Sequence, residues 1–188
     1  MKIFIDYDTT LNNFDHCWFK WLLTEHNIKV NHQDVLYWNY ITDTYGQDKD
    51  DFWKNPDIYR NDIVQPRKGA QDFIKQLQYE NKKIAILTSS YPGTEQAKDE
   101  HIQRHFGNIE IIHSHDKPTV TKDSILIDDN VLTIRDHCIQ NQMPGIVFDN
   151  CCNGWSRSQL ICDDLDKITS LIYFRSEYYS MINFLMTY

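Results

Sequence analysis

The sequence predicts an α/β protein with a doubly wound parallel sheet, and two recurring patterns lead to that prediction. Short apolar runs of the kind found in buried parallel strands recur along the chain. Segments in which apolar residues repeat at helical spacing lie between most of these runs. Because parallel strands are joined by long crossover connections, this alternation favours one sheet with helices on its faces. The strand candidates are residues 2–5, 83–87, 109–112, 124–127 and 145–148.

Apolar spacing also predicts the helices that accompany this sheet. Three helices are expected, at residues 70–77, 94–107 and 131–142, and Gly107 is a typical residue to end the second. Residues 168–188 are helical in pattern and rich in Tyr and Phe. We interpret that tail as a closing helix against the sheet, and a contact between two copies of the chain, a homodimer, stays open.

One long segment interrupts the alternation, because it contains no convincing strand. Its first part has apolar residues at i, i+3, i+4, i+7 and i+8, which predicts an amphipathic helix with its tryptophans in the core. These residues are Phe14, Cys17, Trp18, Trp21 and Leu22. The sequence therefore predicts an α/β core of residues 1–13 and 66–188, with residues 14–65 as a small helical cap over the carboxyl edge of the sheet.

Composition excludes several classes of protein. The net charge of −8 comes from 19 basic and 27 acidic residues, and proteins that coat nucleic-acid polymers need the opposite balance. No apolar run approaches the ~18 residues of a membrane span. The five cysteines include an adjacent pair and no Cys-x-x-Cys spacing, which is a poor disulfide or zinc framework. With a strand where a signal peptide would stand, these features predict a cytoplasmic protein without nucleic-acid or membrane partners.

Two carboxylates follow the first strand candidate directly. Asp6 and Asp8 come after residues 2–5, at the carboxyl end where open α/β sheets bind their ligands. Alternation along a strand points both side chains the same way, so their negative charges converge. Such convergence requires a cation or a shared proton. The pattern Asp-x-Asp also arises by chance in an acidic chain, so it does not establish chemistry alone.

Three later strand candidates also end in polar residues. Thr88 and Ser89 end the second, Lys117 lies in the loop after the third, and the adjacent pair Asp128 and Asp129 ends the fourth. A Ser/Thr turn or a solvated lysine explains the first two features separately. The set as a whole has a chemical logic. Carboxylates hold a hard cation such as Mg²⁺, and the metal and the lysine neutralise a phosphoryl group that one aspartate attacks.

This set of motifs resembles that of the haloacid dehalogenase superfamily of phosphohydrolases. The four motifs of that superfamily match residues 6–10, Thr88, Lys117 and the pair Asp128-Asp129, and the resemblance covers essentially the whole chain. It implies the Rossmann-like core of that superfamily, a bound Mg²⁺ and phosphoryl transfer through an aspartate.

Within the superfamily the chain is most similar to the 5′(3′)-deoxyribonucleotidases. In that family the first motif continues through Leu to Phe, the cap carries an aromatic–Trp pair followed by Tyr-Gly, and a Trp precedes the return to the sheet. Thr9 stands where members usually have Gly, and Asn130 where they often have Arg or Lys. The matching residues are Leu11, Phe14, Tyr37-Trp38, Tyr45-Gly46, Trp53, residues 116–120 and residues 126–129.

The resemblance implies a role for each polar residue. Asp6 is the expected nucleophile, and Asp8 the expected general acid and base, with a proton retained at neutral pH because other carboxylates crowd it. Mg²⁺ is expected on Asp6, on the backbone carbonyl of Asp8 and on one of the second acidic pair, with Asp129 favoured over Asp128.

The remaining implied contacts concern the substrate. Thr88 and Lys117 are expected to hold the phosphate, with help from Ser89. Aromatic residues among polar neighbours are expected to stack a nucleobase. These are Phe14, Tyr37, Trp38, Trp53 and Tyr59, with Phe14 and Trp38 foremost. The eight histidines are interpreted as structural or solvated; His101 and His105 are four residues apart but have no HExxH pattern.

The function predicted from all of these features is Mg²⁺-dependent hydrolysis of (deoxy)ribonucleoside monophosphates through an aspartyl-phosphate. Its partner is a small-molecule nucleotide. Two alternatives stay open: a phosphatase for another small ester, such as a sugar phosphate or phosphoserine, and an inactive binding protein of the same fold. A receiver-type signalling module is disfavoured, because its lysine comes last in the chain, whereas here an acidic pair follows Lys117.

Overall fold

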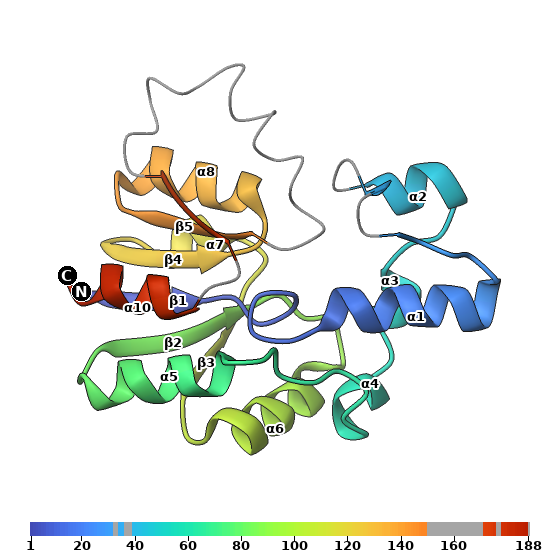
Figure 1. Cartoon of the computed structure of the whole chain (residues 1–188), viewed down its shortest axis with the longest axis horizontal. Helices are drawn as coiled ribbons and strands as arrows, with labels where there is room; N and C mark the ends of the chain where they lie inside the picture. The colour runs from blue at the N-terminus through green and yellow to red at the C-terminus, as the bar shows by residue number, and fades with distance from the viewer. Residues whose placement is uncertain (32–33, 36–38, 150–170, 176–177, 188) are drawn as a thin grey trace.

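One parallel sheet of six strands forms the centre of the computed structural model, which describes residues 1–31, 34–35, 39–149, 171–175 and 178–187 (Figure 1). The strand order is β3-β2-β1-β4-β5-β6, and every neighbouring pair is parallel. The order reverses between β1 and β4, and ligands of doubly wound sheets bind at such a switch point. The predicted fold class is therefore confirmed. The strands are β1 (Lys2–Ile5), β2 (Lys83–Thr88), β3 (Glu110–His113), β4 (Ser124–Asp128), β5 (Gly145–Asp149) and β6 (Leu171–Arg175).

Helices cover both faces of this sheet. Ile3 and Ile5 of β1 belong to an apolar cluster that includes α5, α6 and α10, whereas Phe4 faces the cluster that includes α8. This alternation explains why residues 3–5, 84–87 and 125–127 of the central strands are apolar without interruption. The helices predicted at residues 70–77, 94–107 and 131–142 are confirmed as α5, α6 and α8. The covering helices are α5 (Ala70–Tyr79), α6 (Glu95–Phe106), α7 (Lys117–Val120), α8 (Val131–Asn141) and α10 (Tyr178–Leu185).

The segment between β1 and α5 is helical in the part that the structure describes. Its helices are α1 (Phe14–His26), α2 (Tyr40–Tyr45), α3 (Asp50–Trp53) and α4 (Asp57–Arg60). They lie beyond the carboxyl ends of the strands (Figure 1). Four of its residues form a separate small apolar cluster, while Phe52 and Tyr59 join the cluster of the sheet. The four are Phe19, Leu22, Val35 and Ile41. The segment thus has some core of its own and is also packed onto the α/β core.

The predicted tail helix is wrong in its first part. Residues 171–175 form strand β6, which pairs with β5 at the edge of the sheet, and helix α10 begins only at Tyr178. Isoleucine, tyrosine and phenylalanine in this run favour a strand, and short apolar runs have no periodicity that separates strand from helix. The closing helix itself is present. Met181 and Leu185 are buried, and the Tyr178 hydroxyl donates to the backbone carbonyl of Thr10 at 2.6 Å.

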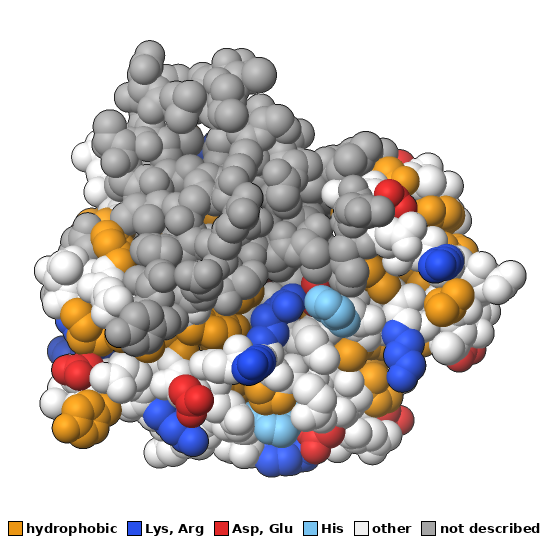
Figure 2. Space-filling view, viewed as in Figure 1, with side chains coloured by type: hydrophobic (Ala, Val, Ile, Leu, Met, Phe, Trp, Pro, Cys, Tyr) orange, Lys and Arg blue, Asp and Glu red, His pale blue; other side chains and the backbone are white. Residues whose placement is uncertain are grey.

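The described surface has no continuous basic region on the face in Figure 2, where basic and acidic side chains are interspersed. Among the described residues, no helix is long and apolar enough to cross a membrane. Cys17 is a free thiol, Cys138 is buried, and the other three cysteines lie outside the described residues.

Candidate active site

The strand order brings the predicted polar residues together at one edge of the sheet. β1 lies between β2 and β4, so the residues that follow these three strands are neighbours. They line a cavity of about 530 Å³ together with residues of the helical segment. The predicted site residues that line it are Asp6, Asp8, Phe14, Trp53, Thr88, Ser89, Lys117, Asp128 and Asp129. Tyr37 and Trp38 lie outside the described residues.

Lys117 links the carboxylates at the carboxyl ends of β1 and β4. Its ammonium donates to Asp6 Oδ1 and to Asp128 Oδ2, both at 2.6 Å, and the side chain is buried. Burial opposes the charge, but the two carboxylates outweigh it and raise the pKa of Lys117 above its ordinary value. Asp116 caps the short helix α7 by accepting from the Thr119 amide and hydroxyl. This cap fixes the turn from which Lys117 reaches the carboxylates.

Three buried carboxylates surround this ammonium. Asp6, Asp128 and Asp129 can each offer an oxygen, and these oxygens lie within 4.8 Å of one another. Burial and the neighbouring Asp128 raise the pKa of Asp6 to about 6 in spite of Lys117, and the pKa of Asp129 is raised well above its ordinary value for the same two reasons. One ammonium does not balance three carboxylates. Buried oxygen donors with excess negative charge suit a hard divalent cation such as Mg²⁺.

The surroundings and the protonation of Asp8 differ from the expectation based on the sequence. Its Oδ2 accepts from Lys98 Nζ at 2.7 Å, and its Oδ1 accepts from the side-chain amide nitrogen of Asn12 at 2.9 Å. The Tyr59 hydroxyl lies within hydrogen-bonding distance of both oxygens, at 3.0 Å from Oδ1 and 2.9 Å from Oδ2. Burial alone would raise the pKa of Asp8, but these donors, Lys98 foremost, lower it. The expected proton at neutral pH is therefore wrong for the ligand-free protein. The neighbours of Asp8 are donors rather than the crowd of carboxylates that the sequence suggested.

Lys98 is a site residue that the sequence interpretation missed. Its side chain is fully buried, and besides Asp8 it donates to the Ser89 carbonyl at 2.5 Å and to Thr88 Oγ1 at 3.4 Å. A signal for it existed. Lys98 occurs three residues before His101 on the inward face of α6, where a lysine needs a buried partner.

The two hydroxyl residues at the end of β2 are differently engaged. Thr88 is buried, and its hydroxyl donates to the Ser89 carbonyl at 3.2 Å while it accepts from Lys98. The Ser89 hydroxyl donates to the carbonyl of Ser114 at 3.1 Å, which links the end of β2 to the loop after β3. Both residues face the cavity, so a phosphoryl oxygen in the cavity would meet the end of β2.

The turn after Asp8 is unusual, because Thr9 has a φ of 67°. A β-branched residue rarely adopts this left-handed conformation. Asn12 Oδ1 holds the turn by accepting from the amides of Thr9 and Phe14, and Arg67 donates to the Thr9 carbonyl at 2.7 Å. The family that the chain resembles usually has Gly at this position, and the backbone here adopts the conformation that glycine favours.

The aromatic residues of the helical segment form part of the cavity wall. Phe14 is buried and packs edge-to-face on Phe52 with ring centroids 5.2 Å apart. Trp53 is half-buried, and its ring lies 6.3 Å from that of His115 and 5.3 Å from the Lys98 ammonium. Trp18, expected in the core, is half-buried and also lines the cavity. The described wall thus offers flat apolar surface next to the carboxylates.

Comparison with solved structures shows which known proteins share the fold. A haloacid dehalogenase family hydrolase from Deinococcus radiodurans, solved with phosphate and sodium, matches 99% of this chain and 95% of its own at a TM-score of 0.62 and 12% identity. A hydrolase from Pseudomonas syringae matches 100% and 98% at a TM-score of 0.58 and 13% identity. The fold is therefore that of the haloacid dehalogenase superfamily hydrolases.

Sequence similarity then identifies the family. No protein-family model matches the chain. A curated 5′(3′)-deoxyribonucleotidase from Clostridium acetobutylicum is 33% identical over 177 residues, which cover 86% of this chain and 94% of the relative. The chain belongs to the 5′(3′)-deoxyribonucleotidase family of haloacid dehalogenase-type phosphatases. It is accordingly a hydrolase of the phosphatase class.

Proposed function

We propose that this protein is a Mg²⁺-dependent phosphomonoesterase that hydrolyses (deoxy)ribonucleoside monophosphates through an aspartyl-phosphate on Asp6. The observation that carries the proposal is the bridge from Lys117 to Asp6 and Asp128 beside a cavity with an aromatic wall. The family relative, named for deoxyribonucleotide hydrolysis, supports the substrate class.

We propose Asp6, Asp129 and the backbone carbonyl of Asp8 as the ligands of Mg²⁺. Asp128 is proposed as the partner of Lys117, because its oxygens accept from Lys117 and from the Asn130 amide. The donor set fits the ion, since all the ligands are oxygens and the carboxylates carry excess charge. When bound, Mg²⁺ would neutralise part of the phosphoryl charge that forms in the transition state.

Asp6 is the proposed nucleophile. With a pKa of about 6, it is mostly ionised at neutral pH, and Lys117 fixes one of its oxygens. A bond forms from the carboxylate oxygen to phosphorus while the bond from phosphorus to the ester oxygen breaks. The ammonium of Lys117 and the hydroxyl of Thr88 would hold the phosphoryl oxygens, with Ser89 beside them.

The proton that Asp8 would give to the leaving oxygen needs a source other than Asp8 itself. Because its donors keep it ionised, the proton that the leaving oxygen needs must enter with the substrate. A phosphate monoester has a second pKa of about 6, so its monoanion carries that proton. We propose that the monoanion gives it to Asp8, which passes it to the leaving nucleoside oxygen. The ionised Asp8 then takes a proton from the water that hydrolyses the aspartyl-phosphate.

The helical segment is proposed to bind the base. Residues 14–65 would form a cap whose aromatic side chains stack a flat ring, with Phe14 and Trp53 at the described cavity wall. Tyr37 and Trp38 are included from the family resemblance alone. A cytoplasmic location and the homodimer stay predictions from the sequence.

A panel of phosphate esters tests the proposal. We expect Mg²⁺-dependent phosphate release from nucleoside monophosphates, little from sugar phosphates or phosphoserine, and none after a chelator is added or Asp6→Asn is introduced. Faster release from a sugar phosphate or phosphoserine would favour the alternative phosphatase. Release from no ester, in a protein that still binds nucleotide, would favour the inactive binding protein.

A further inference from the structure

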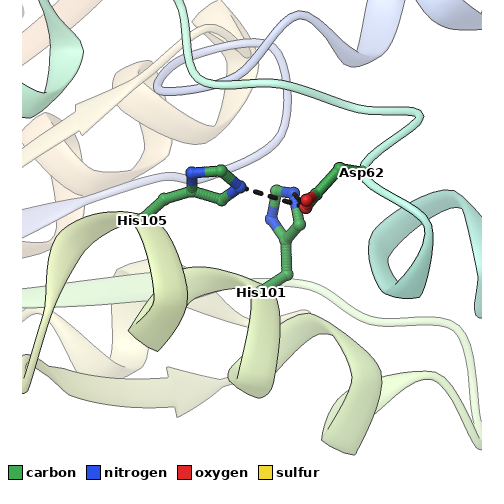
Figure 3. A group of neighbouring side chains, drawn as sticks. All are labelled: Asp62, His101 and His105. Carbon is green, nitrogen blue, oxygen red and sulfur yellow. Dashed lines mark hydrogen bonds and ion pairs between the residues drawn. The ribbon is translucent and has the colours of Figure 1, made fainter.

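A second group of metal-ligating side chains lies outside the catalytic cavity. His101 and His105 project from α6 toward Asp62, which lies in the segment between α4 and α5 (Figure 3). Asp62 Oδ1 lies 3.3 Å from His101 Nε2 and 3.1 Å from His105 Nε2. One ligand atom from each of the three residues lies within 4.8 Å of the other two. None of the three lines the catalytic cavity.

These separations are those of ligands that share one tetrahedral ion. Bonds of about 2.0–2.1 Å from zinc to nitrogen or oxygen place two ligand atoms of a tetrahedron about 3.3 Å apart. The two measured nitrogen–oxygen distances, 3.3 and 3.1 Å, are close to that value. We propose that Asp62, His101 and His105 bind a divalent transition-metal ion, with Zn²⁺ as the preferred ion.

The donor set separates this site from the proposed Mg²⁺ site. Two imidazoles and one carboxylate suit Zn²⁺, Ni²⁺ or Cu²⁺, whereas Mg²⁺ prefers oxygen ligands. His101 is fully buried, but 36% of the Asp62 side chain is exposed, which leaves a solvent side for entry and for a water as the fourth ligand. The spacing of four residues on one helix also lies within the range of zinc-binding histidine pairs.

The surroundings of His101 already orient its ring. In the metal-free protein its Nε2–H donates to the Val64 carbonyl at 2.9 Å, and the Tyr7 hydroxyl donates to Nδ1 at 2.5 Å. Burial and the neighbouring His105 lower the pKa of His101 to about 4, so the ring is neutral at pH 7. Metal binding at Nε2 would require the other neutral tautomer, in which the single ring proton has moved by exchange with solvent from Nε2 to Nδ1 and donates to the Tyr7 oxygen. Metal-bound histidines commonly have such a partner on their other nitrogen.

Arg104 is the group that opposes a cation here. Its Nη1 donates to Asp62 Oδ1 at 2.7 Å and also reaches the Arg60 carbonyl at 3.5 Å. The guanidinium therefore orients the carboxylate but repels the ion, which limits the affinity. Because 43% of the Arg104 side chain is exposed, it can turn toward solvent or toward Arg60 when the ion enters.

Binding would join two parts of the chain that are far apart in sequence. Asp62 belongs to the segment that returns from the helical insertion, and His101 to a helix of the α/β core. An ion shared between them would hold the end of the insertion on α6, so the folded protein should gain stability when it binds.

Cobalt and zinc titrations of the full-length protein, with Mg²⁺ in excess, test this proposal. We expect one equivalent of Co²⁺ to give the visible absorption of a tetrahedral ion without a thiolate charge-transfer band. At about 100 times its Kd, Zn²⁺ should raise the Tm by roughly 5–10 °C. Both effects should be lost in His105→Gln and in Asp62→Asn.

A matched control and a folding check complete the test. His26→Gln removes an exposed histidine from α1 and should leave the cobalt spectrum and the zinc-dependent rise in Tm unchanged. Circular dichroism of the metal-free variants verifies that they fold. The proposal is overturned by wild-type protein that binds no Co²⁺ or Zn²⁺ beyond Mg²⁺, or by equal binding in wild type and folded His105→Gln. A cobalt spectrum with thiolate bands would likewise assign the ion to cysteine.

Discussion

At the scale of single residues, hydrogen-bond donors set the protonation state of Asp8, the second aspartate of the first motif. Asp6 and Asp8 are two positions apart in one motif, yet the pKa of one is raised and that of the other is lowered. Asp6 shares its ammonium with Asp128, whereas Asp8 receives hydrogen bonds from Lys98 and Tyr59. The same residue type thus has different protonation in adjacent positions, because the environment sets the balance.

Replacing Lys98 with methionine tests this account of Asp8. The pKa of Asp8 should rise, because burial remains while the largest lowering influence is removed. In the wild type we expect kcat/KM to fall above about pH 6, where the substrate loses its second proton. In Lys98→Met this fall should move to higher pH, since Asp8 then retains its own proton, while activity at the optimum drops roughly 10- to 100-fold.

The pH profile of kcat/KM has a matched control in Lys98→Arg, which keeps a positive charge beside Asp8. In that variant kcat/KM should fall at the same pH as in the wild type. An unchanged profile in folded Lys98→Met would mean that Lys98 does not set the protonation of Asp8.

Thr9 provides a second test at this scale, one of stability. A β-branched residue with a φ of 67° is strained by about 1–2 kcal/mol, and glycine would remove that strain. Part of the gain is offset by the greater freedom of glycine in the unfolded chain. We expect Thr9→Gly to raise the free energy of unfolding by up to about 1 kcal/mol, measured by urea denaturation. A clear loss of stability would show that the threonine side chain makes a contact that outweighs the strain.

Some site residues could be predicted from the sequence, and the physical reason is geometric. Asp6, Thr88 and Asp128 stand at the ends of buried strands, and parallel pairing brings such ends to one edge. Lys98 could not be assigned to the site in this way, and Tyr59, expected to stack a base, donates instead to Asp8. They reach Asp8 from a helix and from the insertion, so their contacts depend on packing between elements distant in sequence.

At the scale of elements, strands with several apolar residues and helices with clear spacing were predictable. The helices α5, α6 and α8 have their apolar faces on the sheet, and their spacing reflects this burial. Strand β6 was not predictable, because residues 171–174 form a short apolar run without periodicity that precedes a true helix. The part of the insertion between α1 and α4 was predicted only as helical, since its helices are as short as four residues.

The aromatic wall of the cavity makes a prediction at this scale. Trp53→Ala should weaken nucleoside monophosphate binding roughly 5- to 150-fold, because stacking of one base contributes about 1–3 kcal/mol. Turnover of a small phosphate donor without a ring, such as acetyl phosphate, should change little. Trp21→Ala is the matched control, since Trp21 packs on Phe52 but does not line the cavity. Equal loss on both substrates in Trp53→Ala would contradict a base-stacking role.

At the scale of the whole molecule, the buried carboxylates of the site lower the free energy of unfolding of the metal-free protein. Three buried carboxylates around one ammonium are unfavourable without a cation. The folded-state pKa of Asp129 is above its ordinary value, so its contribution to stability is full below about pH 4 and is lost as the pH rises through the folded-state pKa. At neutral pH the metal-free protein therefore contains a destabilising group that Mg²⁺ would offset.

Removing the carboxylate of Asp129 should stabilise the metal-free protein and weaken Mg²⁺ binding. We expect Asp129→Asn to raise the Tm of the metal-free protein by roughly 2–4 °C for each kcal/mol of repulsion relieved. The same variant should lose the rise in Tm that Mg²⁺ produces in the wild type, and thermal melts with Mg²⁺ or with a chelator measure both. A lower Tm without metal, together with an intact response to Mg²⁺, would exclude Asp129 as a ligand.

The central claim is that Asp6 accepts the phosphoryl group, and rapid quenching tests it most directly. Wild-type protein mixed with Mg²⁺ and a deoxynucleoside monophosphate labelled in its phosphate should contain acid-trapped label on the peptide that carries Asp6. We predict that this label is absent without Mg²⁺ and in Asp6→Asn, which should also release no phosphate. Continued phosphate release by Asp6→Asn, or label on a different residue, would contradict the account.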